Sequence, residues 1–154
     1  MNTIYQKIKA HAAKNPDAIA IFSGNQTNSL TYQFLLELIE TIQQQLNTLG
    51  IKKGDRLALL APANSLETAT AILALSCSTT CALINPQLTE QELREYLTQL
   101  KPKVLFYFPE YKKVAKKFNL DTFEIIRDTK KIKPHPNPPL TKGRESFPPL
   151  TKGG

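Results

Sequence analysis

The spacing of apolar residues along the chain switches repeatedly between a helical and an extended pattern. Ile4, Ile8 and Ala12 recur at four-residue intervals, which is the spacing of one helix face. A longer apolar stripe follows Thr31, a residue type that caps helices, and Gly50 is placed to end that helix. The members of this longer stripe are Leu35, Leu38, Ile39, Ile42, Leu46 and Leu49.

Short apolar runs separated by turn residues predict strands between the helices. The expected strands lie at residues 18–22, 28–31, 56–61, 81–84, 104–108 and 122–126, with further helices at residues 65–75, at residues 89–100 and after Pro109. Thr89 and Glu92 form a capping box at the start of the second of these helices. Strands that alternate with helices in this order predict an α/β fold with a mainly parallel sheet flanked by helices.

The composition changes sharply near residue 133. The final 21 residues hold six of the 11 prolines, and Pro138-Pro-Leu-Thr-Lys-Gly143 is repeated as Pro148-Pro-Leu-Thr-Lys-Gly153. Paired prolines do not fit a helix or an inner strand, and few apolar residues remain to offset the entropy of ordering. We therefore predict a folded region at residues 1–133 and a disordered Pro-rich repeat tail at residues 134–154. A proline-rich ligand for an aromatic groove is the weaker alternative for this tail.

The net charge of +7 is confined to the last third of the chain. Residues 1–100 carry seven basic and eight acidic side chains, whereas residues 101–154 carry 13 and five. Lys112, Lys113, Lys116 and Lys117 recur at helical spacing, so each pair shares a helix face, and a solvated face is favoured over a polyanion contact. No specific nucleic-acid partner is expected.

Residues 68–84 carry no charge, but six of these 17 residues are Ser or Thr. This length is the lower limit for a membrane span, so a buried helix that runs into a buried strand is favoured and no membrane span is expected. The first residues lack the apolar core of a signal peptide, and two cysteines do not form a disulfide framework. These features predict a cytoplasmic location.

The sequence assigns no catalytic, cofactor-binding or metal-ligating residue. Only three glycines precede the tail, and they are too far apart for a phosphate-binding loop. Cys77 and Cys81 have the spacing of one helix face, but zinc would also need His11 and His135, so the cysteines are expected to be small buried residues. The other candidates, all interpreted as structural, are Asp55, Arg56 and the Ser/Thr-rich run at residues 76–80.

Three segments stand in order along the chain. They are Leu30-Thr-Tyr-Gln-Phe-Leu35, residues 49–64 with Gly50-Ile-Lys-Lys-Gly-Asp-Arg-Leu-Ala58, and residues 71–93 with Leu83-Ile-Asn-Pro86 and Leu88-Thr-Glu-Gln-Glu-Leu93. In this order they resemble the adenylate-forming superfamily of acyl-CoA synthetases, aryl-CoA ligases and the adenylation domains of peptide synthetases. The first is similar to the opening of that family's first long helix, the second to its Gly-Val-x-x-Gly-Asp-x-Val-Ala segment, and the third to its Leu-x-x-Gly-Ala…Asn-Pro segment and the next helix. Together with Lys101-Pro-Lys-Val-Leu-Phe106, the resemblance covers about residues 3–128.

The resemblance implies the N-terminal subdomain of an enzyme that activates a carboxylate with ATP and Mg²⁺ and passes the acyl group to CoA or a carrier thiol. The family's phosphate loop, its adenine and ribose motifs, and its C-terminal lysine domain have no matching stretch in this sequence. No functional residue is therefore carried over to any position, and no cofactor is expected to be bound by this chain itself.

These points favour a truncated N-terminal portion of an AMP-forming acyl-CoA synthetase or carboxylate ligase that is not catalytic by itself. One alternative is a split-enzyme subunit whose partner chain carries the ATP site. Another is a noncatalytic α/β interaction module that holds an acidic partner through its basic end. The expected partners are a complementary ligase fragment or a second copy bound through exposed apolar surface.

Overall fold

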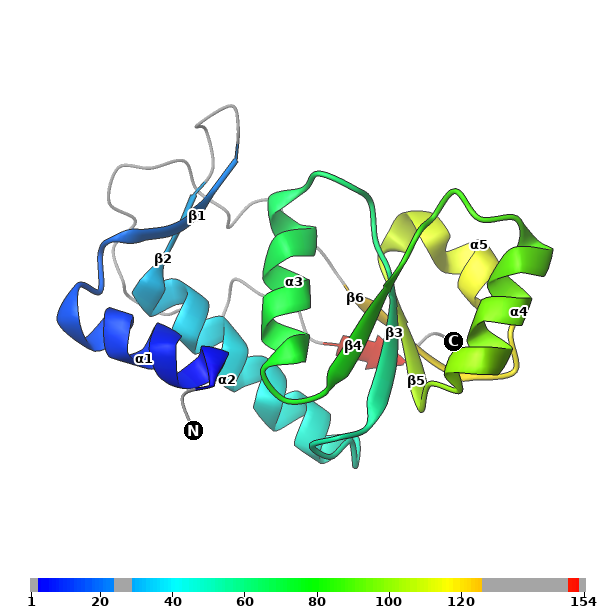
Figure 1. Cartoon of the computed structure of the whole chain (residues 1–154), viewed down its shortest axis with the longest axis horizontal. Helices are drawn as coiled ribbons and strands as arrows, with labels where there is room; N and C mark the ends of the chain where they lie inside the picture. Colours follow the sequence, from blue (N-terminus) through cyan, green and yellow to red (C-terminus); the bar gives the residue numbers. More distant parts are fainter. Residues whose placement is uncertain (1–2, 24–28, 126–149, 153–154) are drawn as a thin grey trace.

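A computed structural model of the chain describes residues 3–23, 29–125 and 150–152. Helices and strands alternate along most of this length (Figure 1). The elements are α1 (Ile4–Lys14), β1 (Ile19–Phe22), β2 (Ser29–Thr31), α2 (Tyr32–Thr48), β3 (Arg56–Leu60), α3 (Leu66–Ser76), β4 (Thr80–Ile84), α4 (Glu90–Leu100), β5 (Val104–Tyr107), the 3-10 turn η1 (Pro109–Tyr111), α5 (Lys112–Ala115), β6 (Asp121–Ile125) and β7 (Leu150–Lys152). The predicted α/β order is confirmed, with element ends that differ by one or two residues.

A five-stranded sheet with the order β4-β3-β5-β6-β7 forms the centre of the molecule (Figure 1). Strands β3 to β6 run parallel, and only β7 is antiparallel to its neighbour. Strands β1 and β2 form a separate antiparallel pair beside α2 and α3. The prediction of a mainly parallel sheet flanked by helices is therefore confirmed.

Successive residues of β3 face two different cores. Leu57 and Leu59 pack in the cluster that includes α1, α2 and α3. Ala58 and Leu60 pack in the cluster that includes α4 and α5. The side chains of β3 after Arg56 are all at most 1% exposed, and those of β5 are all buried. The fold is thus a sheet between two helical layers, with β3 and β5 as its buried inner strands.

Local signals at both ends of α2 act as predicted. The hydroxyl of Thr31 accepts a hydrogen bond from the Phe34 N–H at 3.2 Å. At the other end Gly50 has a φ of +72°, and the Ile51 N–H donates to the Leu46 carbonyl at 2.9 Å. This pattern, together with burial of Ile51 and Leu46 in one cluster, is a Schellman motif.

Two predicted core positions are wrong. Ile4 and Leu49 continue the apolar stripes of their helices, but their side chains are 54% and 37% exposed. Each stripe is wider than the surface against which its helix packs. The strand expected to be buried at residues 81–84 is also half-exposed, because β4 is an edge of the sheet.

Part of the C-terminal prediction lies within the described residues. Leu150–Lys152, in the second repeat copy, pair as β7 with Phe123–Ile125 of β6, so these three residues are extended and paired. For these three residues the predicted disorder is wrong, because they pair with β6 as a strand at the edge of the sheet. The rest of the expected tail, the boundary near residue 133 and most of the expected turn at residues 23–27 lie outside the described residues.

Candidate functional site

The carboxyl ends of β3 and β5 are where an open α/β sheet normally binds a ligand. The chain leaves β3 toward α3 on one face of the sheet and leaves β5 toward η1 and α5 on the other face. The strand order reverses between these neighbouring strands, and the crevice outside such a reversal is the usual ligand position. The segments that meet there are the turn at residues 61–65 and the start of η1.

The turn after β3 uses its polar groups internally. The Ser65 hydroxyl accepts from the Thr68 N–H at 3.0 Å and donates to the Thr68 hydroxyl at 2.8 Å. The Thr68 hydroxyl in turn donates to the carbonyl of Pro62 at 2.8 Å. Asn64 takes the left-handed conformation, φ +58°, which asparagine tolerates well. The Ser65 side chain therefore caps the N-terminus of α3, so the Thr68 N–H does not need a bound anion as its partner.

The end of β5 is closed by aromatic side chains. Phe108 donates its N–H to the Leu60 carbonyl at 3.0 Å, and both Tyr107 and Phe108 are fully buried. The Tyr107 hydroxyl has no hydrogen-bond partner among the described residues. Burial, followed by the nearby Glu124 carboxylate, raises the pKa of Tyr107, while Lys112 opposes this shift. The phenol therefore stays protonated at neutral pH and is not a nucleophile.

Lys112 and Glu124 form an ion pair beside Tyr107. The Lys112 Nζ atom lies 3.3 Å from Glu124 Oε2, and this contact ties α5 to β6. A cation, a carboxylate and a buried phenol form the cluster at this end of the described sheet that comes nearest to a catalytic arrangement. The first two neutralise each other, so the grouping supports packing better than it supports catalysis.

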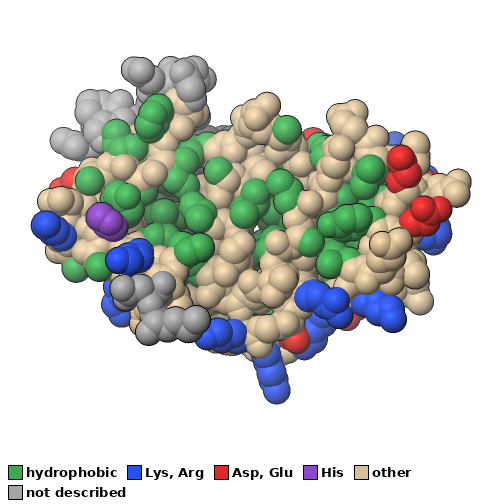
Figure 2. Space-filling model, in the orientation of Figure 1, with side chains coloured by type: hydrophobic (Ala, Val, Ile, Leu, Met, Phe, Trp, Pro, Cys, Tyr) green, Lys and Arg blue, Asp and Glu red, His purple; other side chains and the backbone are tan. Residues whose placement is uncertain are grey.

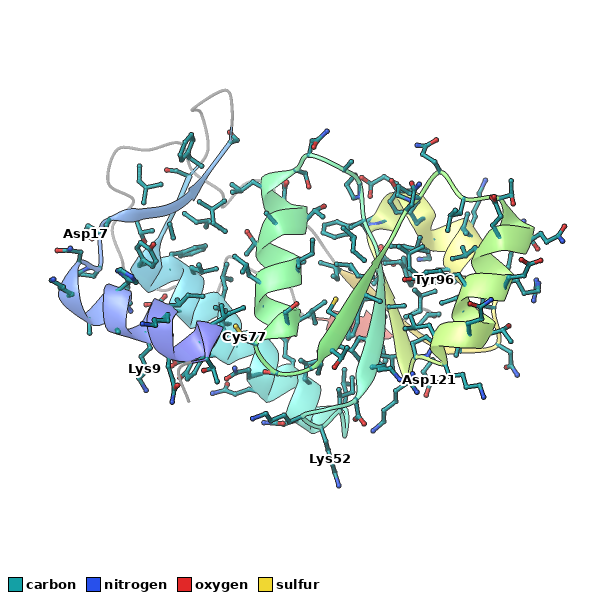
Figure 3. The ribbon with its side chains drawn as sticks, in the orientation of Figure 1. Lys9, Asp17, Lys52, Cys77, Tyr96 and Asp121 are labelled. Atoms are coloured by element: carbon teal, nitrogen blue, oxygen red, sulfur yellow. The ribbon has the colours of Figure 1, made fainter. Side chains whose placement is uncertain are left out.

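The two cysteines lie at the junction of α3 and β4. Helix α3 ends at Ser76, so Cys77 caps the helix and Cys81 belongs to β4, and the pair does not share a helix face. Figure 3 shows Cys77 at the end of α3. Both thiols are free and partly buried, and burial raises the pKa of each, that of Cys81 to about 11. A neutral thiol is a poor nucleophile, which supports the structural interpretation.

Asp55 stabilises the turn before β3, as its position in the sequence predicts. Its Oδ2 atom accepts from the Lys52 N–H at 2.7 Å and from the Lys103 Nζ at 2.8 Å. The Lys103 hydrogen bond, and after it the Lys52 N–H, lowers the pKa of Asp55. Lys103 also donates to the Gly50 carbonyl at 2.8 Å. This cluster lies at the amino ends of β3 and β5, opposite the usual ligand edge, and the Lys52 side chain extends away from it (Figure 3).

Sequence reasoning did not anticipate the partners of the basic segment. Lys117 Nζ lies 2.6 Å from Glu90 Oε2, and this contact lowers the pKa of Glu90. Lys112 pairs with Glu124 as described above, so two of the four clustered lysines join α5 to other elements. Only the exposed Lys113 and Lys116 remain for the solvated face that the spacing predicts. No spacing rule could have found these pairs, because their members are 12 and 27 residues apart.

A metal site and a membrane span are not found in the parts of the chain that the structure describes. Residues 3–23, 29–125 and 150–152 contain no cluster of three or more His, Cys, Asp or Glu side chains that could hold an ion. The ring of His11 stacks on that of Tyr32, with centroids 5.0 Å apart. His135, the other imidazole, lies outside the described residues. Within the same ranges, every helix is too short or too polar to cross a membrane.

Comparison with known proteins gives one consistent family. A family model described as AMP-binding enzyme matches residues 8–146. The chain is 25% identical over 135 residues to acetyl-coenzyme A synthetase 1 of Candida albicans, which covers 85% of this chain and 20% of the synthetase. The structure superposes on the N-terminal domain of FACL13 from Mycobacterium tuberculosis with a TM-score of 0.66 and 27% identity, over 76% of this chain and 30% of that one.

A second solved structure extends the fold comparison. O-succinylbenzoate coenzyme A synthetase of Bacillus subtilis, in complex with ATP and a magnesium ion, matches with a TM-score of 0.66 over 76% of this chain and 32% of that chain. At 21% identity this likeness shows the fold alone. The chain spans about one fifth of the length of the relatives that it matches in sequence.

Proposed function

Because the chain belongs to the AMP-binding enzyme family, we propose that it forms the N-terminal scaffold of an AMP-forming acyl-CoA ligase and does not catalyse the reaction by itself. All three segments that carry the resemblance, residues 30–35, 49–64 and 71–93, lie within the range that the family model matches. The family membership deduced from those segments is therefore confirmed.

The observation that carries the proposal is the share of the relatives that the chain covers. It aligns with about one fifth of each relative's length and with about one third of the solved chains, one of which is an N-terminal domain. The remaining four fifths of a relative have no counterpart here. A ligase of this family would draw its other binding and catalytic groups from that remainder.

The chemistry of the family makes demands that the described residues do not meet. A carboxylate oxygen attacks the α-phosphorus of ATP and expels pyrophosphate, and a thiol then attacks the acyl carbonyl and expels AMP. These steps need donors for a triphosphate and oxygen ligands for Mg²⁺. Gly50 and Gly54 each serve a turn, and Lys103, Lys112 and Lys117 are each paired with a carboxylate. We therefore propose that ATP, Mg²⁺ and CoA bind to the part of the ligase outside this chain.

Carboxylate-dependent exchange of pyrophosphate into ATP tests the proposal. The purified chain is expected to show exchange no faster than a protein-free blank, across acetate, medium-chain and long-chain fatty acids and benzoate. A complete family ligase with acetate as substrate is the positive control. Carboxylate-dependent exchange by the chain above the blank, abolished by EDTA, would contradict the proposal.

A split enzyme is the second candidate, and the exposed apolar side of the molecule favours it. A subdomain that normally packs against other domains leaves such surface uncovered when it stands alone. We propose that the chain lies in the cytoplasm. If the split-enzyme candidate is right, affinity purification of the chain from that compartment is expected to recover a polypeptide with the missing four fifths of the ligase. Recovery of the chain without such a polypeptide rejects it.

The basic interaction module is the least supported alternative. Residues 101–125 carry six lysines and three acids, and three of these lysines pair with a carboxylate: Lys103 with Asp55, Lys112 with Glu124 and Lys117 with Glu90. The rest of the excess positive charge beyond residue 100 lies in residues 126–154. Within the described part of the chain, the basic segment therefore serves mainly to join elements of the fold.

A further inference from the structure

The two edges of the central sheet are protected very differently. The edge beyond β6 is covered by β7, a three-residue antiparallel strand that follows Pro148 and Pro149 and includes Lys152. Short length, proline and lysine are the usual means of preventing further strand pairing. Among the strands that the structure describes, the other edge is β4, which has five residues, no proline and no charge. Its register with β3 is continuous over all five residues, without a bulge.

The segment that contains β4 and most of α3 is also uncharged. Residues 68–84 form most of α3 and all of β4, and these two elements pack against each other. Figure 2 shows this side of the molecule with apolar and neutral groups across its centre, whereas Lys and Arg gather mostly along the lower rim. Leu83 is 48% exposed there. An apolar centre with a charged rim is the anatomy of an interface.

We propose that the free edge of β4 pairs with β4 of a second copy of this chain, antiparallel and about a two-fold axis, to give one continuous ten-stranded sheet. A two-fold axis perpendicular to the sheet brings the same face of both copies together, so only residues on one face can lie opposite each other. The pairing that uses all five residues is centred on Ala82. This register places Cys81 of each copy opposite Leu83 of the other copy, and Thr80 of each copy opposite Ile84 of the other.

The side chains that meet in this arrangement are complementary. The register with β3 puts Cys81 beside Leu57 and Leu83 beside Leu59, so both lie on the face covered by α3. The exposed Leu83 of one copy then covers the smaller Cys81 of the other. Because β4 carries no charge, nothing on the strand repels its own copy. Length, polarity and side-chain size therefore match a second β4 without requiring any other partner.

This inference concerns the chain as it stands without the rest of a ligase, and it is separate from whether the chain catalyses the reaction. Sedimentation velocity over 1–200 μM is the first test, where the mass is expected to rise from one copy to two without larger species. Leu83→Lys puts a charge into both halves of the interface and is expected to weaken dimerisation at least about tenfold. Ile4→Lys, which changes a similarly exposed apolar side chain on α1, is the matched control and should leave the dimer intact.

Disulfide trapping tests the register itself. In a Cys77→Ser background, Leu83→Cys places a thiol opposite Cys81 of the partner at a separation that a disulfide can span. Mild oxidation is expected to give a covalent dimer on a non-reducing gel, and adding Cys81→Ser should abolish it. A monomer at every concentration, or a dimer unaffected by Leu83→Lys and not trapped by Leu83→Cys, would overturn the proposal.

Discussion

Replacing Gly50 with alanine isolates the backbone contribution of the Schellman motif that ends α2. Gly50 has a φ of +72°, and a Cβ atom added there would meet nothing within 4 Å. A steric clash therefore adds nothing to the loss of stability. The loss comes from the strain of the left-handed conformation, roughly 1–2 kcal/mol for a residue with a Cβ atom. Alanine also lowers the conformational entropy of the unfolded chain, which raises the free energy of unfolding by roughly 0.4–1 kcal/mol. The expected net loss of unfolding free energy is about 1 kcal/mol.

Urea unfolding followed by far-ultraviolet circular dichroism measures this loss. For a domain of this size it corresponds to a fall in Tm of about 2–4 °C. Gly50→Asn is the matched variant, because asparagine adopts the left-handed conformation at lower cost, and it should lose about half as much. An alanine variant as stable as the natural chain, or an asparagine variant less stable than the alanine one, would show that the motif is not formed as described.

Two further predictions concern protons and thiols. The partners described above lower the pKa values of Asp55 and Glu90, so their contribution to stability is present above the ordinary carboxyl pKa near 4 and is lost as the pH falls. Burial raises the pKa values of Cys81 and Tyr107, so stability is expected to decline again above about pH 9, with Tm between pH 3 and 11 as the measurement. For the thiols, Cys81 in a Cys77→Ser variant should react with a disulfide reagent at pH 8 more slowly than Cys77 in a Cys81→Ser variant. Equal rates in the folded state would contradict the difference in burial.

Local features of the fold could be predicted from the sequence because their causes lie within a few residues. The cap at Thr31, the glycine after α2 and the capping box of Thr89 and Glu92 each involve backbone groups three to five positions away. The same holds for the turn at Asp55, whose carboxylate reaches the N–H of Lys52. Such signals survive any change in tertiary packing, and the structure has all of them.

Features that depend on packing could not be predicted in this way. The apolar stripe of α2 extends to Leu49, which is exposed. Whether another element covers this position depends on how the elements are arranged in space, and the stripe does not show that arrangement. Nothing in the sequence places β4 at an edge, since the chain passes through β3, β4 and then β5 while the sheet has the order β4-β3-β5. The pairs Asp55–Lys103 and Glu90–Lys117 likewise join residues that only the folded chain brings together.

The topology places the usual ligand crevice of an open α/β sheet at the reversal between β3 and β5. The turn at residues 61–65 satisfies its own polar groups there, whereas the buried Tyr107 hydroxyl at the end of β5 has no hydrogen-bond partner among the described residues. A site needs polar groups that the fold leaves unpaired and aimed at one point. The surface that we propose as a docking site lies elsewhere, at the backbone edge of β4 and the uncharged α3–β4 segment. If that edge pairs as proposed, this chain acts through a surface that binds polypeptide, as the proposed scaffold role requires.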